Sequence, residues 1–156
     1  MRWLRGWIGV VILLASGPGI AATANQGPQP CEQIANSVLI QVQGVHSSQG
    51  TLVAELYGDT ASDFLKKAGR IVRERVAARS GSVSVCLAAP RPGVYAVVVY
   101  HDENDNHRFD RAWNGLPAEG FGVSNNPRPF MRPPTLAEAA FEVGSGHRVM
   151  KIELRY

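Results

Sequence analysis

The chain has 156 residues, of which 45% are hydrophobic and 19% are charged. This length fits one domain with its own hydrophobic core and excludes two ordinary domains. The near balance of 16 Lys and Arg against 13 Asp and Glu argues against a nucleic-acid-binding surface or an electrostatic membrane anchor.

The first 24 residues have the pattern of an export signal. Two arginines, Arg2 and Arg5, precede an apolar stretch at 7–15 and a small-residue cleavage site at 22–24. The apolar stretch is shorter than the roughly 20 residues that span a bilayer, which disfavours a transmembrane anchor. We therefore predict a signal peptide at 1–24, a periplasmic or secreted location, and no integral membrane segment after cleavage. The remaining 132 residues carry a net charge of +1, because the signal holds two arginines and no acid.

An N-terminal arm, residues 25–36, precedes a domain predicted at 37–156. The two cysteines are Cys31 in the arm and Cys86 in the domain. Disulfides persist in exported proteins, so we expect these two residues to be bridged. On the chain-entropy model, a bridge closing a loop of this length stabilises the fold by about 4 kcal/mol. A free catalytic thiol is the alternative, although neither cysteine lies in a recognisable nucleophile motif.

Alternation of apolar and polar residues, typical of half-buried strands, dominates the domain. It predicts strands at 37–45, 51–57, 71–77, 82–88, 94–101, 138–143 and 147–155, and a short helical turn at 61–69. About seven short strands joined mostly by hairpin-length links predict an all-β fold, a two-layer antiparallel β-sandwich of immunoglobulin-like or transthyretin-like build. The stretch 94–100 is almost wholly apolar, so we expect it at the centre of a sheet, covered on both faces.

Some 36 residues, 102–137, separate the fifth predicted strand from the sixth. Loops of this length in a small domain are either functional or disordered. Apolar side chains can pack this loop against the sheet, so we predict that it is ordered: Trp113, Leu116, Phe121 and Phe130. The residues that we expect to contact a ligand also lie in this loop: Trp113, Phe121, Ser124, Asn125 and Asn126.

Oxygen-bearing side chains occupy the first, third, fifth and ninth positions of the segment 102–110: Asp102, Asn104, Asn106 and Asp110. The same positions supply ligands in the helix-flanked calcium loop, where the seventh residue, here Arg108, contributes its backbone carbonyl. Two positions differ from that loop. His107 stands where glycine allows a sharp turn, and Trp113 stands where a bidentate acid belongs. Histidine tolerates positive φ, and Glu119 and Asp105 are the two candidates to complete the shell after a chain reversal.

Two other interpretations of this segment remain open. Asp and Asn can form a hydrogen-bonded turn by capping their own backbone amides, with Glu103 and Arg108 solvated. Alternatively, His101 and His107 can bind a transition metal, although no third soft ligand is evident.

Two motifs resemble an uncharacterised bacterial family, the domain of unknown function 2141. The first is Gly-x-Tyr-Ala before His-Asp-x-Asn, and the second is Gly-x-Pro-x-Glu-Gly-Phe-Gly-x-Ser-Asn-Asn. They match at Gly93, Tyr95, Ala96, His101, Asp102, Asn104, Gly115, Pro117, Glu119, Gly120, Phe121, Gly122, Ser124, Asn125 and Asn126. The resemblance implies an exported protein with a β-sandwich fold, and it identifies no catalytic residue. The family loop has glycine where this chain has His107.

Two functions follow as expectations. The first is an exported binding module, calcium-stabilised through the loop 102–110, that contacts a protein or glycan partner at the cell envelope. The second is an envelope hydrolase that uses Glu119 with Asp102 or Asp110 as paired carboxyl groups. A serine hydrolase is disfavoured, because the segment 81–85 lacks the closing glycine of a nucleophile elbow.

Overall fold

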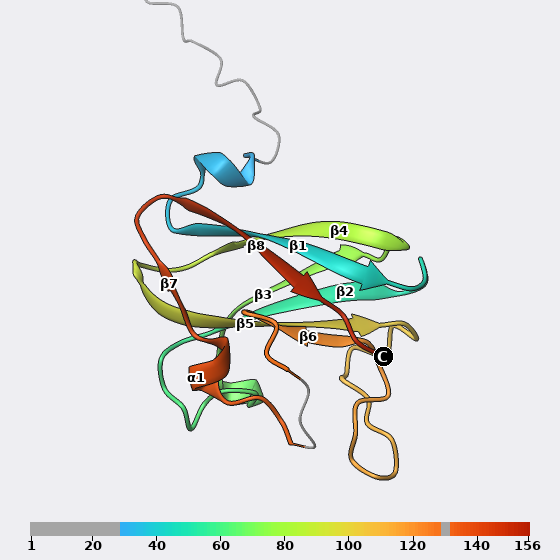
Figure 1. Cartoon of the computed structure of the whole chain (residues 1–156). Coiled ribbons are helices and arrows are strands. Elements are labelled where there is room, and N and C mark those ends of the chain that lie inside the picture. Colours follow the sequence, from blue (N-terminus) through green and yellow to red (C-terminus); the bar gives the residue numbers. More distant parts are fainter. Residues whose placement is uncertain (1–28, 129–131) are drawn as a thin grey trace, which may run out of the picture.

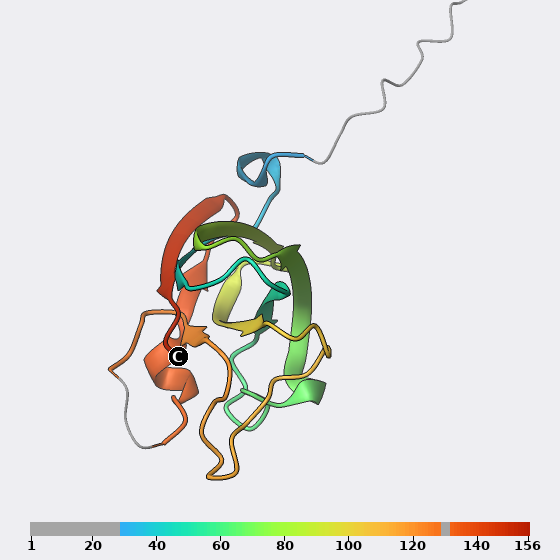
Figure 2. The same cartoon turned by 90° about the vertical axis from the view of Figure 1, so that its right-hand side faces the viewer.

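Two β-sheets are stacked face to face in a computed structural model, which describes residues 29–128 and 132–156 (Figures 1 and 2). The first sheet has the order β4 (Gly81–Ala88), β1 (Ser37–Val45), β8 (His147–Glu153). The second has the order β3 (Arg70–Ala77), β2 (Thr51–Tyr57), β5 (Gly93–Asp102), β6 (Phe121–Val123), and β7 (Phe141–Val143) pairs with the start of β5. The predicted all-β sandwich is therefore confirmed. The predicted signal peptide and Phe130 lie outside the described residues.

The core between the sheets is built by the alternation seen in the sequence. In β1, Val38, Ile40 and Val42 point inward and are fully buried, and they meet the inward side chains of β2, β5 and β8. In β5, eight consecutive residues are buried, from Tyr95 to Asp102. One side of β5 faces this core, and the other faces a smaller cluster of Tyr57, Phe64, Ala96, Val98, Val123 and Ala139. The prediction that this strand is central and covered on both faces is confirmed.

Three features differ from the sequence-based expectation. The β1 and β8 strands pair in parallel, whereas the prediction was wholly antiparallel, because the chain crosses from the second sheet to the first between β7 and β8. The predicted strand 138–143 is shortened by α1 (Leu136–Ala139), where Thr135 and Glu138 form a capping box that starts a helix. The three-residue strand β6 was missed, because it pairs with only three residues of β5. Two 3₁₀ turns, η1 (Cys31–Gln33) and η2 (Lys67–Gly69), complete the elements.

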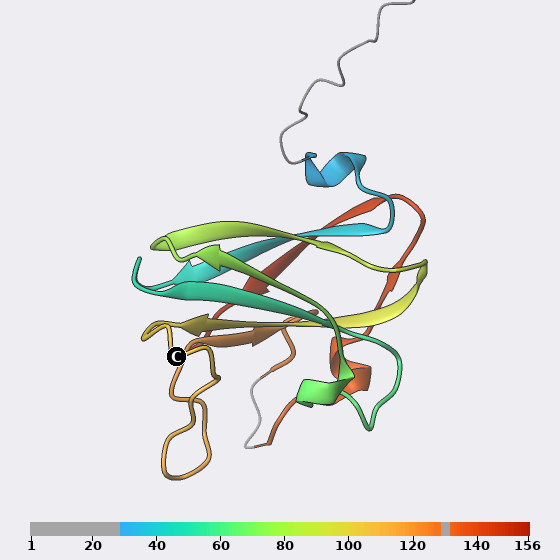
Figure 3. The same ribbon diagram turned by 180° about the vertical axis from the view of Figure 1, so that it is seen from behind.

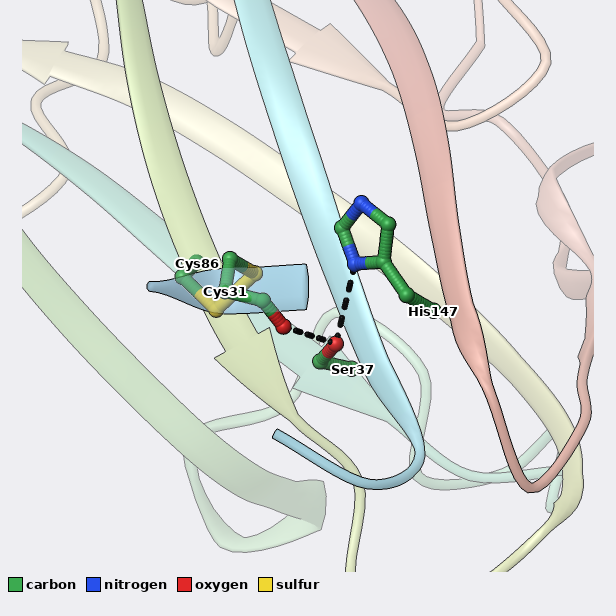
Figure 4. The surroundings of a disulfide bond; sticks show 4 residues. All are labelled: Cys31, Ser37, Cys86 and His147. Carbon is green, nitrogen blue, oxygen red and sulfur yellow. Dashed lines mark hydrogen bonds between the residues drawn. A yellow bond between two sulfur atoms is a disulfide. The ribbon is translucent and has the colours of Figure 1, made fainter. Parts of the chain in front are cut away.

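The N-terminal arm is attached to the first sheet by a disulfide bond between Cys31 and Cys86, as predicted (Figure 4). Beside it, the buried hydroxyl of Ser37 donates a hydrogen bond of 2.6 Å to the Cys31 carbonyl oxygen, and His147 Nδ1 lies 3.0 Å from the same hydroxyl. A carbonyl only accepts, so the serine proton points to Cys31 and the imidazole donates to the serine oxygen. This Ser–His contact is therefore not an activated nucleophile.

Candidate functional site

The acidic segment begins at Asp102, the last residue of β5, whose side chain is fully buried. One carboxylate oxygen, Oδ1, accepts the backbone N–H of Asn106 at 3.0 Å, and Oδ2 accepts that of His107 at 2.9 Å. Arg75, on β3, approaches Oδ2 at 3.5 Å. The chain after β5 therefore coils around a single buried carboxylate.

Asn104 and Asn106 connect this coil to Asp110. Each amide oxygen accepts a backbone N–H two residues further on, and each amide nitrogen donates to Asp110 Oδ2, at 2.9 Å and 2.8 Å. Three of the four side chains predicted to converge thus meet at one carboxylate oxygen. Asp102 joins them through the backbone of Asn106. The local hydrogen-bonded turn that the sequence left open is present.

Two residues of the coil have a left-handed backbone, Asp105 with φ 57° and His107 with φ 65°. His107 is the residue that replaces the glycine of a calcium loop, and it adopts the conformation that such a glycine provides. Its ring accepts a hydrogen bond from Arg75 Nη1 at 2.8 Å, which supports this sharp turn from the neighbouring strand. The expectation that histidine tolerates this position is confirmed.

Glu119 reaches the coil from the far side of the loop. Its Oε2 accepts the backbone N–H of Asp110 at 3.1 Å. The residue is only 5% exposed, and its Oε1 is buried without a hydrogen-bond partner among the described residues. Burial raises the pKa of this carboxyl group, and the negative charges of Asp102, Asp110 and Glu103 raise it further, against the lowering effect of the Asp110 N–H.

Between Asp110 and Glu119 the chain forms a small hairpin that projects from the end of the sandwich (Figures 1 and 3). Arg111 pairs with Pro117, and backbone bonds from Ala112 to Leu116 and from Gly115 to Ala112 close the turn. Trp113 lies at its tip and is 99% exposed, and Leu116 is also exposed. The expectation that these two side chains pack the loop down is wrong. Backbone hydrogen bonds within the hairpin and packing at its base stabilise it instead.

The base of the hairpin is packed by aromatic rings. The Phe109 ring lies 5.4 Å from the rings of both Tyr100 and Phe121. Phe121 is therefore partly buried against the outer face of the second sheet, where it extends the smaller apolar cluster. Trp113 and Phe121 were the two aromatic residues predicted to contact a ligand, and only Trp113 is fully presented to solvent.

The three polar residues predicted to contact a ligand make structural hydrogen bonds. Ser124 is buried and donates to the carbonyl oxygen of Ala139 at 2.5 Å. Asn125 donates to the carbonyl oxygens of Glu138 and Ala140, and Asn126 bonds the backbone of β8 at Lys151 and Glu153. These bonds fasten the end of β6 to α1 and β8.

The structure separates the histidines that the sequence offered as a transition-metal pair. The His101 ring belongs to a group with His46 and Glu103, and His107 belongs to another with Asp102 and Asp105. Two residues that were not predicted as part of the site contact it from neighbouring strands: Arg75 pairs with Asp102, and Thr51 donates a hydrogen bond to Asp105. In the sequence, Arg75 is marked only by its place in the predicted strand 71–77, which does not say what its side chain faces.

Comparison with protein families gives one match. A family model described as an uncharacterized protein conserved in bacteria (DUF2141) matches residues 40–151. The searches of curated proteins and of solved structures each gave no match. No helix within the described residues has the length and apolar character needed to cross a membrane.

Proposed function

This chain belongs to the uncharacterised bacterial family DUF2141, and from that premise we propose that it is an exported binding module whose contact element is the hairpin between Asp110 and Glu119. The observation that carries the proposal is the position of Trp113, which is 99% exposed at the tip of a hydrogen-bonded hairpin. An exposed indole is costly in water, and tryptophan is prominent among residues that dominate binding energy.

A preorganised base makes the hairpin suitable for binding, because a rigid contact element loses little conformational entropy when a ligand attaches. Below the tip, the base is fixed by the hydrogen bond from Asp110 to Glu119 and by contact between the tilted rings of Phe109 and Phe121. The ligand class that we propose is a glycan or a protein at the cell envelope.

Calcium is proposed to stabilise this base. The support is Glu119, whose buried Oε1 has no described partner and which lies among the negative charges of Asp102, Asp110 and Glu103. Either a proton or a cation relieves that repulsion. Calcium fits a set of carboxylate and amide oxygens, with Asn104, Asn106 and the Arg108 carbonyl as the further ligands. A bound ion competes with the hydrogen bonds that the Asn104 and Asn106 side chains donate to Asp110. The calcium affinity is therefore modest, in the range of extracellular modules.

The test is a glycan-array screen of the purified protein with the Trp113→Ala variant. Ile71→Ala is the matched control, because Ile71 is an exposed apolar residue on β3. The proposal expects specific glycan signals that disappear in Trp113→Ala and persist in Ile71→Ala, with equal melting temperatures for all three proteins. Glycan signals that survive Trp113→Ala contradict the proposal that Trp113 contacts the ligand. An array that gives no signal excludes the glycans tested and leaves a protein as the proposed ligand class.

The hydrolase alternative rests on the raised pKa of Glu119, which is the property of a general acid. Its carboxyl group is buried, however, and one oxygen is bonded to the backbone of Asp110. The structure therefore supports the binding function better. Hydrolysis of an envelope polymer that Glu119→Gln abolishes would favour the hydrolase.

A further inference from the structure

Four side chains from distant parts of the sequence meet where β1, β5 and the C-terminus come together. His46 follows β1, His101 lies within β5, Glu103 follows β5, and Tyr156 is the last residue. Figures 1 and 3 show the C-terminus beside the end of β5. This histidine cluster shares no ligand with the calcium site proposed above.

The ligand atoms are close enough for one ion. His46 Nε2 lies 2.8 Å from Glu103 Oε1, and His101 Nδ1 lies 3.8 Å from the same oxygen. All three atoms lie within 4.8 Å of one another. Ligands of a tetrahedral zinc ion, bonded at about 2.0–2.1 Å, are about 3.3 Å apart. The observed separations bracket that value, so small side-chain shifts suffice.

The environment of His101 sets which of its nitrogen atoms is free to bind an ion. This ring is fully buried, and its Nε2 lies 2.7 Å from the Gln49 carbonyl oxygen. A carbonyl only accepts, so Nε2 carries the proton and Nδ1 presents its lone pair to the cluster. Histidine ligands of metals typically have this arrangement, with the second ring nitrogen donating to a backbone carbonyl or a carboxylate.

The other two ligands are also oriented by neighbours. The His46 ring stacks on Tyr156 with centroids 3.6 Å apart, which sets its plane. Ser47 donates to Glu103 Oε1 at 2.6 Å, and this bond is the main reason that the pKa of Glu103 is held below its usual range. Among the described residues, Glu103 forms ion pairs with the two histidines and with no lysine or arginine. Its charge is therefore available to a cation.

Solvent reaches the cluster from one side, because His46 is exposed and Tyr156 is 53% exposed. The Tyr156 hydroxyl lies 2.8 Å from His101 Nδ1 and donates to it. Burial raises the pKa of this phenol, so the hydroxyl keeps its proton for that bond. A metal entering from solvent replaces this hydrogen bond and the one between His46 Nε2 and Glu103 Oε1.

We propose that His46, His101 and Glu103 form a site for a divalent transition metal of the zinc class. Two imidazole nitrogens and one carboxylate oxygen suit zinc, whereas calcium requires oxygen ligands alone. Three protein ligands leave a fourth position open to water or to a ligand of the protein.

Calorimetric titration of the purified protein with zinc tests this site, and cobalt absorption reports its geometry. We expect one equivalent of zinc to bind and one equivalent of cobalt to give the intense visible bands of tetrahedral coordination. His46→Gln and Glu103→Gln should each weaken zinc binding by at least about tenfold, judged from the size of ligand-shell effects. His46 is exposed, so its variant keeps the fold, and an unchanged melting temperature verifies this.

The matched control is His107→Asn, which removes a histidine from the neighbouring group and keeps a residue that tolerates positive φ. Zinc affinity should be unchanged in this variant. Equal affinity in the wild type and His46→Gln overturns the proposal, and so does loss of binding in His107→Asn, which would place the ion beside Asp102 and Asp105.

Discussion

Asp110 donates its backbone N–H to Glu119 Oε2 at 3.1 Å, and this bond joins the two ends of the projecting hairpin to the acidic coil. The second oxygen of the same carboxylate is buried without a described partner. The residue that closes the hairpin thus also has a buried oxygen without a described partner and lies near the negative charges of Asp102 and Asp110. The contact element and the proposed ion site depend on one side chain.

Calcium should raise the melting temperature of the wild-type protein relative to a chelator. At about 10 mM calcium, roughly a hundred times a dissociation constant on the order of 10⁻⁴ M, the added stability is about 2.7 kcal/mol. Glu119→Gln should remove this response and should melt above the wild type without calcium, because the neutral amide ends the repulsion with Asp102 and Asp110. Glu142→Gln, at an exposed position of β7, is the control that keeps the response. A calcium shift preserved in Glu119→Gln would contradict the proposed site.

Asp102→Asn should destabilise the protein by roughly 2–3 kcal/mol in urea denaturation. In the wild type, the buried carboxylate accepts the backbone N–H groups of Asn106 and His107, and the substitution turns an amide NH₂ group towards one of them. The substitution also removes the negative charge that pairs with Arg75. Asp105→Asn is the isosteric comparison at an exposed site with positive φ, which asparagine tolerates, and it should change stability by less than about 1 kcal/mol. Faster hydrogen exchange at the amides of Asn106 and His107 should accompany Asp102→Asn alone. Equal losses in the two variants would show that Asp102 does not organise the coil.

Gly50→Ala should be more damaging than Gly81→Ala. Both glycines have positive φ, 67° and 96°, so each substitution carries the backbone penalty of about 1–2 kcal/mol. A Cβ on Gly81 meets nothing within 4 Å, whereas one on Gly50 falls 2.0 Å from the Asp102 carbonyl oxygen. Gly50 adjoins Gln49, whose carbonyl oxygen accepts a hydrogen bond from His101. Gly50→Ala should therefore also weaken zinc binding. Thermal melts of the two variants, read side by side, check the difference, and equal melting temperatures would refute it.

Removal of the disulfide by Cys31→Ser with Cys86→Ser should lower stability by about 4 kcal/mol, because the closed loop spans 55 residues. The double variant should melt at the same temperature with and without reductant, while the wild type should shift down on reduction to match it. A wild-type melting temperature that does not change on reduction would contradict the predicted contribution of the disulfide to stability.

The Glu138 carboxyl group should titrate with a pKa of about 2, because Arg132 and the capping hydrogen bonds of Thr135 favour its charged form. A lowered pKa means that this contribution to stability is fully present above the ordinary value of 4.5 and is lost as the pH falls towards 2. Carboxyl-carbon NMR titration measures it directly. In Arg132→Ala the pKa should move up towards 4.5, and a titration unaffected by that change would remove the stated cause.

The sequence by itself determined most of the strands and the residues of the acidic coil. The strands at 37–45 and 51–57 have their predicted bounds. In the first, alternation places Val38, Ile40 and Val42 in the core, and a one-residue shift would expose them. The coil was readable for a similar reason, since Asp and Asn side chains bond the backbone of their own segment. Local interactions suffice in both cases.

Apart from the disulfide between Cys31 and Cys86, the contacts between distant segments were decided by the tertiary structure. The parallel pairing of β1 with β8 depends on where the chain crosses between layers, and the exposure of Trp113 depends on a hairpin whose base is closed by Glu119. His46 and His101 are 55 residues apart, and neither lies in a metal-ligand motif. They meet because β1 and β5 end at the same edge of the sandwich, and proximity created by packing leaves no periodic trace in a single sequence.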